Sequence, residues 1–115
     1  ISEKKYSANE GERMRKVLEY TMKNYSDRIT LKDVSDVAVM TKNAFCKYFK
    51  KRTNKTYFEF LKTIRIEHAC ALLREKKEMS ISEIARRTGY NNISNFNRQF
   101  RAVINISPQK FRTLY

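Results

Sequence analysis

The sequence has few of the residues that break helices or connect short strands. It contains 2 glycines and 1 proline among 115 residues. A fold built of many short strands needs frequent tight turns, which these two residues supply. Their scarcity argues against such a fold and favours helices joined by short polar turns. We therefore predict an all-α fold of about seven helices.

Residues that build metal and catalytic sites are also scarce. His68 is the only histidine, and the 2 cysteines, Cys46 and Cys70, lack the paired spacing of a zinc site. The sequence has no glycine-rich phosphate loop and no Ser, His and Asp set suited to nucleophilic catalysis. We predict no metal, no cofactor, no catalytic residue and no enzyme activity. Both cysteines are expected to be free thiols in a reducing cytoplasm.

The sequence also has few acidic residues and no long apolar runs. No apolar run approaches the roughly 18 residues that span a bilayer, and no signal peptide is recognisable, so no membrane span is expected. Lys and Arg number 25 against 12 Asp and Glu, a formal net charge of +13. Such an excess is typical of a chain with a polyanionic partner, and nucleic acid is the first choice. A disordered basic tail is excluded because 41% of the residues are hydrophobic.

The second half of the sequence repeats the first at a nearly constant offset. At an offset of 51, Phe45, Lys47, Phe49, Lys50, Asn54, Thr56 and Phe60 return as Phe96, Arg98, Phe100, Arg101, Asn105, Ser107 and Phe111. At an offset of 50, Leu31, Asp33, Val34 and Ser35 return as Ile81, Glu83, Ile84 and Ala85. The chain is therefore predicted to contain two copies of one small helical unit.

Capping residues and apolar periodicity divide the chain into segments. Residues 1–10 are polar and aperiodic, and we expect a linker there, followed by one domain over 11–115. We expect one helix that begins at residue 11 and a second that follows the Thr30 cap. Four more are expected over 42–52, 57–76, 83–88 and 93–104, and a last one after Ser107-Pro108. The first of these helices has an apolar stripe, formed by Met14, Val17, Leu18, Met22 and Tyr25. Subdomains 11–56 and 78–115 are thus joined by a connecting segment, 57–77.

Each copy has the layout of a helix-turn-helix. A short helix carries a small residue, the turn follows four positions later, and a second helix comes next. The small residue and the turn are Ser35 and Val39 in the first copy, and Ala85 and Gly89 in the second. The second copy has the residue types that this motif usually needs. The repeat extends the assignment to the first.

The second helix of each copy has a buried face and a polar face. At 100° per residue, the phenylalanines of each helix lie together, and the polar side chains cluster opposite them. The polar positions are Asn43, Cys46, Lys47 and Lys50 in one helix, and Ser94, Asn97, Arg98 and Arg101 in the other. Arg or Lys pairs with guanine in the major groove and Asn with adenine. These faces are therefore predicted to read double-stranded DNA.

Four motifs together resemble the DNA-binding domain of the AraC/XylS family of bacterial transcription regulators. They are Arg65-Ile66-Glu67-His68-Ala69-x-x-Leu72-Leu73, Ile84-Ala85-x-x-x-Gly89-Tyr90, Phe96-x-Arg98-x-Phe100-Arg101 and Ser107-Pro108-x-x-Phe111-Arg112. The resemblance implies two helix-turn-helix subdomains, joined by a long central helix, that bind adjacent major grooves. It implies base contacts by Asn43, Cys46, Lys47, Ile93, Ser94, Asn97 and Arg98. We expect phosphate contacts from Thr41, Lys50, Lys51, Asn92 and Arg101.

The expected partner is double-stranded DNA, with RNA polymerase as a candidate second partner, in the bacterial cytoplasm at the nucleoid. A sensor or dimerisation domain is expected before Ile1. The main alternative is a basic helical module that binds an acidic protein or an anionic membrane surface. That alternative predicts apolar side chains exposed beside the cations, whereas the aromatic residues here lie opposite them. An RNA-binding module would be expected to show an open aromatic platform and glycine-rich loops.

Overall fold

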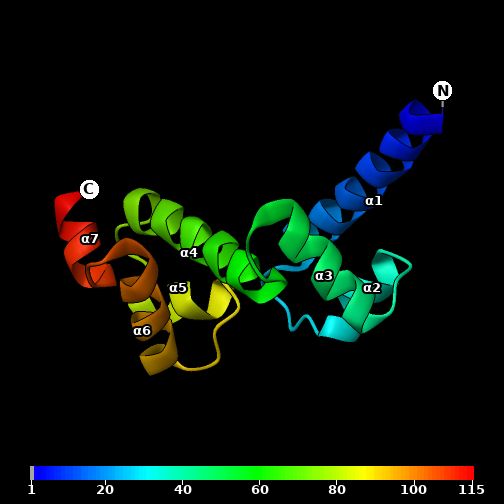
Figure 1. Cartoon of the computed structure of the whole chain (residues 1–115). Helices are drawn as coiled ribbons and strands as arrows, with labels where there is room; N and C mark the ends of the chain where they lie inside the picture. Colours follow the sequence, from blue (N-terminus) through cyan, green and yellow to red (C-terminus); the bar gives the residue numbers. More distant parts are fainter. Residues whose placement is uncertain (1) are drawn as a thin grey trace. The chain divides into compact units, whose positions relative to one another are not determined.

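The computed structural model describes the backbone of residues 2–115 and the side chains of residues 11–115. The described backbone forms helices only, so the all-α prediction is confirmed (Figure 1). The helices are α1 (Ser2–Asn24), α2 (Leu31–Val37), α3 (Lys42–Thr53), α4 (Tyr57–Glu75), α5 (Ile81–Arg87), α6 (Ile93–Ile104) and α7 (Pro108–Leu114).

The chain folds as two compact units. The first unit holds α1, α2, α3 and Tyr57, the first residue of α4. The second unit holds the rest of α4, then α5, α6 and α7, together with the short segment Tyr25–Arg28 that follows α1. The first copy of the sequence repeat, apart from Phe60, lies in the first unit, and the second copy lies in the second unit.

Aromatic rings form the centre of the first unit. Phe45 and Phe49 of α3 are fully buried, and the Tyr57 ring packs edge-on against both, with centroid distances of 5.7 and 5.4 Å. The Tyr57 hydroxyl lies 2.6 Å from Thr21 Oγ1 on α1. Val17 and Val34 complete this core with no exposed surface. Tyr57 therefore ties α3 to α1.

The predicted apolar stripe of α1 is wrong at two positions. Leu18 and Met22 are 38% and 48% exposed, whereas Thr21 is fully buried. The Thr21 hydroxyl donates to the Val17 carbonyl at 2.8 Å and also meets Tyr57, so its polar group is satisfied inside the core. α1 therefore turns a threonine inward.

The second unit is built around a row of four rings. Tyr90, Phe96, Phe100 and Phe111 follow one another with centroid distances of 5.4, 5.8 and 5.7 Å. Ile66, Leu73 and Ile84 pack in the same cluster and are fully buried. Burial of a ring removes a large apolar area from water, so this row contributes strongly to the stability of the unit.

Short polar residues cap most of the helices, and the cap expected at Thr30 is confirmed. Thr30 and Asp33 form a reciprocal capping box at α2, and the Thr41 hydroxyl accepts the Ala44 N–H at α3. Asn54 and Asn105 end α3 and α6 in the left-handed conformation, with φ of 61° and 75°. Asparagine tolerates this conformation better than most residues.

Five boundaries differ from the sequence-based expectation, and the ends of α3, α4 and α5 differ by one residue each. α5 begins at Ile81 because the Ser80 hydroxyl accepts the Glu83 N–H at 3.0 Å, and α4 ends at Glu75. α1 begins at Ser2 and not at Gly11, since apolar periodicity marks the packed part of a helix and says little of its polar start. The assignment of 1–10 as a linker stays a prediction, and Ile1 lies outside the described residues.

Candidate nucleic-acid interface

α3 turns its polar face outward because its aromatic face is held from behind. With Phe45 and Phe49 fully buried, the opposite side chains Asn43, Cys46 and Lys47 are exposed to solvent. Lys50 and Lys51 in the last turn of the helix are exposed as well. The predicted first-copy residues therefore lie on one accessible surface of the first unit.

Two of the residues predicted to contact phosphate form hydrogen bonds at the ends of α3. The Thr41 hydroxyl oxygen caps the helix, at 3.2 Å from the Ala44 nitrogen, and Lys50 Nζ donates to the Asn54 carbonyl at 3.3 Å. A hydroxyl hydrogen and the remaining ammonium hydrogens stay available for an anion. These bonds hold both groups at the ends of the helix.

Tyr48 lies beside the cationic end of α3. The guanidinium carbon of Arg52 is 5.4 Å from the Tyr48 ring centroid, and that of Arg13 is 5.8 Å from it. Burial raises the pKa of the Tyr48 hydroxyl, and the nearby Arg13 charge acts in the opposite direction. The ring therefore stays neutral and packs two arginine side chains against the first unit.

α6 repeats the arrangement in the second unit. Phe96 and Phe100 are fully buried, and Asn92 caps the helix by accepting the Asn95 N–H at 2.9 Å. The predicted second-copy residues on the opposite side, Ser94, Asn97, Arg98 and Arg101, are all exposed, and Ile93 at the first position is 42% exposed.

α6 also contains an internal contact that the sequence analysis missed. Asn95 is partly buried, and its Oδ1 accepts a hydrogen bond from Arg98 Nη2 at 2.9 Å. Gln99 Nε2 lies 3.5 Å from the same oxygen. The spacing of three residues between Asn95 and Arg98 is the signal that would have found the pair.

The turns before α3 and α6 share one hydrogen bond. The Met40 N–H donates to the Ser35 carbonyl at 3.0 Å, and the Tyr90 N–H donates to the Ala85 carbonyl at 2.9 Å. Both turns contain a residue with positive φ, Val39 at 57° and Gly89 at 98°. The two copies are therefore helix-turn-helix motifs of the same local geometry, although only one has glycine in the turn.

Arg65 of α4 supports the second turn. Its Nε and Nη2 donate to the carbonyls of Tyr25 and Asp27 at 2.8 and 2.9 Å, and its guanidinium carbon lies 5.8 Å from the Tyr90 ring centroid. A Cβ placed on Gly89 would lie 2.8 Å from Arg65 Nε. Glycine is therefore required at this turn both for its backbone conformation and for the close approach of Arg65.

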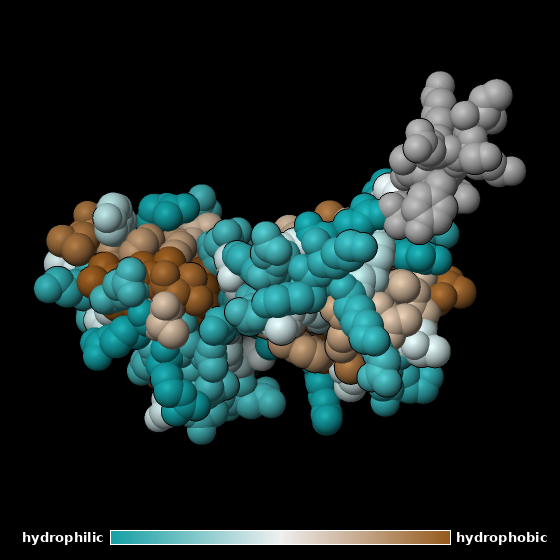
Figure 2. Space-filling view, viewed as in Figure 1, coloured by the Kyte–Doolittle hydropathy of each residue, from teal (hydrophilic) through white to brown (hydrophobic). Residues whose placement is uncertain are grey.

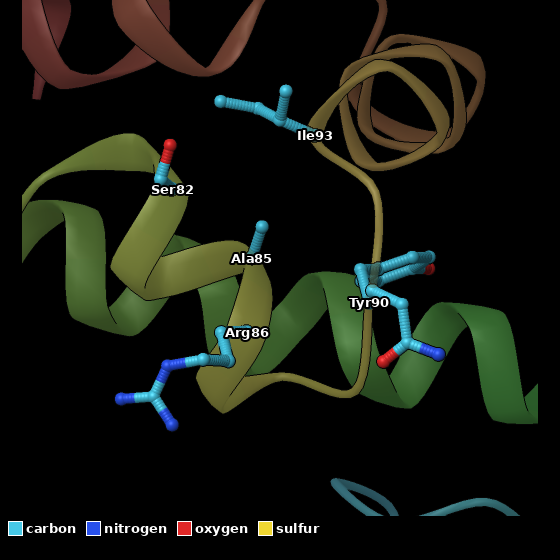
Figure 3. Close-up of a pocket in the computed structure, with 6 residues that line it drawn as sticks. Ser82, Ala85, Arg86, Tyr90 and Ile93 are labelled. Carbon is cyan, nitrogen blue, oxygen red and sulfur yellow. The ribbon is translucent and has the colours of Figure 1, made fainter.

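A hollow of about 410 Å³ lies between α5 and the start of α6. Its lining is Ser82, Ala85, Arg86, Tyr90, Asn91 and Ile93 (Figure 3). Arg86 and Arg87 both pair with Glu83, whose pKa is lowered by the hydrogen bond from Arg87 and then by that from Arg86. The lining offers no set of groups for nucleophilic chemistry, and no three His, Cys, Asp or Glu among the described residues are grouped to hold a metal ion.

Hydrophilic side chains cover much of the visible surface of each unit, with hydrophobic patches between them (Figure 2). Among the described residues, the exposed large hydrophobic side chains are Leu18, Met22, Val39, Phe58, Ile93, Leu114 and Tyr115, and Ile93 alone of these lies on α3 or α6. None of the described helices combines the length and apolar character that crossing a bilayer requires.

Comparison with known proteins identifies the family. A family model described as a helix-turn-helix domain matches residues 34–113. The chain belongs to the AraC-type helix-turn-helix family. It is 28% identical over 102 residues to the HTH-type transcriptional regulator YdeC of Bacillus subtilis, a match that covers 89% of this chain and 35% of YdeC. The chain thus spans about a third of the length of this relative.

Solved structures share the fold of this AraC-type chain. The C-terminal domain of AraT, a response regulator of Geobacillus stearothermophilus, matches with a TM-score of 0.83 and 27% identity, covering 90% of this chain and 85% of that one. The DNA-binding domain of AdpA, solved in complex with a target DNA, matches with a TM-score of 0.80 and 23% identity, covering 86% and 88%. At that identity the second match shows the fold alone.

Proposed function

We propose that this chain binds double-stranded DNA in a sequence-specific way, as the DNA-binding part of a bacterial transcription regulator. The observation that carries the proposal is the repeated arrangement of α3 and α6. Each helix is held by two fully buried phenylalanines and exposes Lys or Arg with Asn on its other side. Arg, Lys and Asn are the side chains that read base edges in the major groove. A net charge of +13 supplies the attraction to phosphate.

The proposed contacts follow the chemistry of each side chain. Arg98 and Lys47 pair with guanine, Asn43 and Asn97 with adenine, and Ser94 with either, while Cys46 and Ile93 contact thymine methyl groups. Phosphate contacts come from Thr41, Lys50, Lys51, Asn92 and Arg101. Phosphate contacts position the protein, and the base contacts determine which site it prefers.

The proposal includes two recognition helices in adjacent major grooves. α4 contains 19 residues and is about 28 Å long at about 1.5 Å per residue. Major grooves on one side of B-DNA recur about every 34–36 Å. A helix of this length is of the right order to separate two such contacts.

The remaining parts of the proposal concern the longer protein. YdeC, like the other curated relatives, extends well beyond the matched region, which supports a sensor or dimerisation domain preceding Ile1. RNA polymerase is then the second partner, and the bacterial cytoplasm, at the nucleoid, is the place of action. The family relatives are transcriptional regulators, so no enzyme activity is proposed.

Selection of bound sites from a random DNA pool tests this function. We expect enrichment of a site with two conserved blocks about one helical turn apart. Insertion of five base pairs between the blocks should abolish the gain over random DNA, because it rotates one block to the opposite side of the duplex. Failure to enrich any sequence, or equal binding to anionic vesicles, would contradict the proposal and favour the membrane alternative.

A further inference from the structure

The Arg98 guanidinium is held before any DNA arrives. Its Nη2 donates to Asn95 Oδ1 at 2.9 Å. The backbone of Asn95 is restrained by the helix cap, because its N–H donates to Asn92 Oδ1 at 2.9 Å, and the residue is partly buried. The acceptor is therefore carried by a residue in the first turn of α6 whose backbone the helix cap restrains.

The first copy of the motif has no such acceptor. The residue equivalent to Asn95 at the offset of 51 is Ala44, and Lys47 stands where Arg98 stands. A methyl group accepts no hydrogen bond, and a lysine ammonium on its flexible stem lacks the planar fork of arginine. The contact is thus specific to α6.

We propose that Asn95 is a positioning residue that holds Arg98 in the orientation in which it reads guanine. The inference rests on the proposed DNA-binding function. An arginine guanidinium has five N–H donors in a planar fork, and Asn95 takes one of them. The other donors remain for the O6 and N7 acceptors of guanine, which require two parallel hydrogen bonds. Holding the side chain in advance reduces the conformational freedom that Arg98 would otherwise lose on binding.

A structural role for Asn95 predicts something different. The cap of α6 is the side chain of Asn92, not that of Asn95, so loss of the Asn95 amide leaves the helix start intact. The Asn95 amide also lies near Gln99 Nε2, at 3.5 Å. Gln99→Ala is therefore the matched control, since it removes the second neighbour of the same oxygen and leaves Arg98 held.

The test measures affinity for the selected DNA site and for random DNA by fluorescence anisotropy. Arg98→Ala first identifies the base pair whose preference is lost. Asn95→Ala should then reduce discrimination at that base pair about five- to tenfold, with affinity for random DNA within twofold of the original protein and an unchanged thermal midpoint. Asn95→Ala combined with Arg98→Ala should discriminate no worse than Arg98→Ala alone. Asn95→Asp keeps the acceptor oxygen, so it should retain discrimination while weakening binding to all DNA.

The outcomes separate the two proposals. If the original protein does not prefer its selected site over random DNA, the proposed function itself fails. If it does prefer that site, and Asn95→Ala changes the affinity for random and selected DNA equally, Asn95 is not a positioning residue. The same conclusion follows if Gln99→Ala reduces discrimination as much as Asn95→Ala does. A final variant transfers the pair to α3. Lys47→Arg with Ala44→Asn should discriminate better at the α3 half-site than Lys47→Arg alone, and equal discrimination would contradict the inference.

Discussion

α3 and α6 have the same buried pair of phenylalanines but expose different chemistry. α3 carries five cations among its 12 residues, Lys42, Lys47, Lys50, Lys51 and Arg52, and three of them fall in its last turn. α6 carries two, Arg98 and Arg101, among a run of Ser, Asn and Gln side chains. Cations attract phosphate regardless of sequence, whereas amides and a held guanidinium form directional bonds to bases. We therefore expect α3 to contribute mainly affinity and α6 mainly discrimination.

The largest expected effects come from the residues that the two helices share. Phe49→Ala and Phe100→Ala should each lower the free energy of unfolding by about 3–5 kcal/mol, because each leaves a cavity in a closely packed core. Urea denaturation followed by circular dichroism measures this loss. Ala102→Ser, on the exposed side of α6, serves as the control. A loss below about 1 kcal/mol in either phenylalanine variant would contradict the assigned buried face.

Substitutions of Arg98 and Lys47 distinguish contacts to bases from general attraction to phosphate. Arg98→Ala should cost about 1–3 kcal/mol at the selected site and relax one base preference, and Lys47→Ala should show a loss in the same range at the α3 half-site. Arg86→Ala removes an exposed cation that pairs with Glu83 outside both recognition helices, and provides the control. Equal losses on random DNA would show that Arg98 or Lys47 contacts phosphate only.

The two turns allow a test of backbone strain. Gly89→Ala should destabilise the second unit by about 1–3 kcal/mol, since alanine is strained at positive φ and its Cβ would displace Arg65. Val39→Gly should have the opposite sign and stabilise by up to about 1 kcal/mol, because relief of a strained β-branched residue exceeds the entropy that glycine adds to the unfolded chain. Thermal unfolding of both variants measures the difference. A loss of stability in Val39→Gly would show that the first turn is not strained.

The smallest expected effect is that of the terminal lysines of α3. Lys50→Gln combined with Lys51→Gln should reduce the slope of log affinity against log salt by about 2, if each lysine contacts one phosphate. Base preference should be unchanged. The measurement is a salt titration from low to physiological concentration. An unaltered slope would remove both residues from the phosphate interface.

Local features of the fold could be predicted from the sequence, and long-range ones could not. The threonine caps, the asparagines that end α3 and α6, and the buried phenylalanines depend on residues within one or two turns of each other. The inward position of Thr21 depends on Tyr57, which lies 36 residues further along the chain. Arg65 donates to the backbone carbonyls of Tyr25 and Asp27, and every residue has such a carbonyl, so the sequence does not indicate which ones accept.

The candidate site divides in a similar way. Every predicted contact residue on α3 and α6 is exposed, as the helical periodicity of these two helices predicts. Whether each one meets a base or a phosphate stays a prediction. The Asn95–Arg98 pair was within reach of a sequence argument, since residues three apart on a helix are neighbours.

Thiol labelling tests the central claim most directly, because the chain carries one cysteine on the proposed interface and one inside the core. Cys46 is exposed on α3, while Cys70 is buried and burial raises the pKa of its thiol, which slows alkylation. Asn97 occupies the position on α6 equivalent to Cys46, so Asn97→Cys in a Cys46→Ser background probes the second helix. We predict that the selected DNA protects the thiol at both positions from alkylation, and that random DNA at a concentration giving the same occupancy protects less. Equal reactivity at either position with and without the selected DNA would contradict the account.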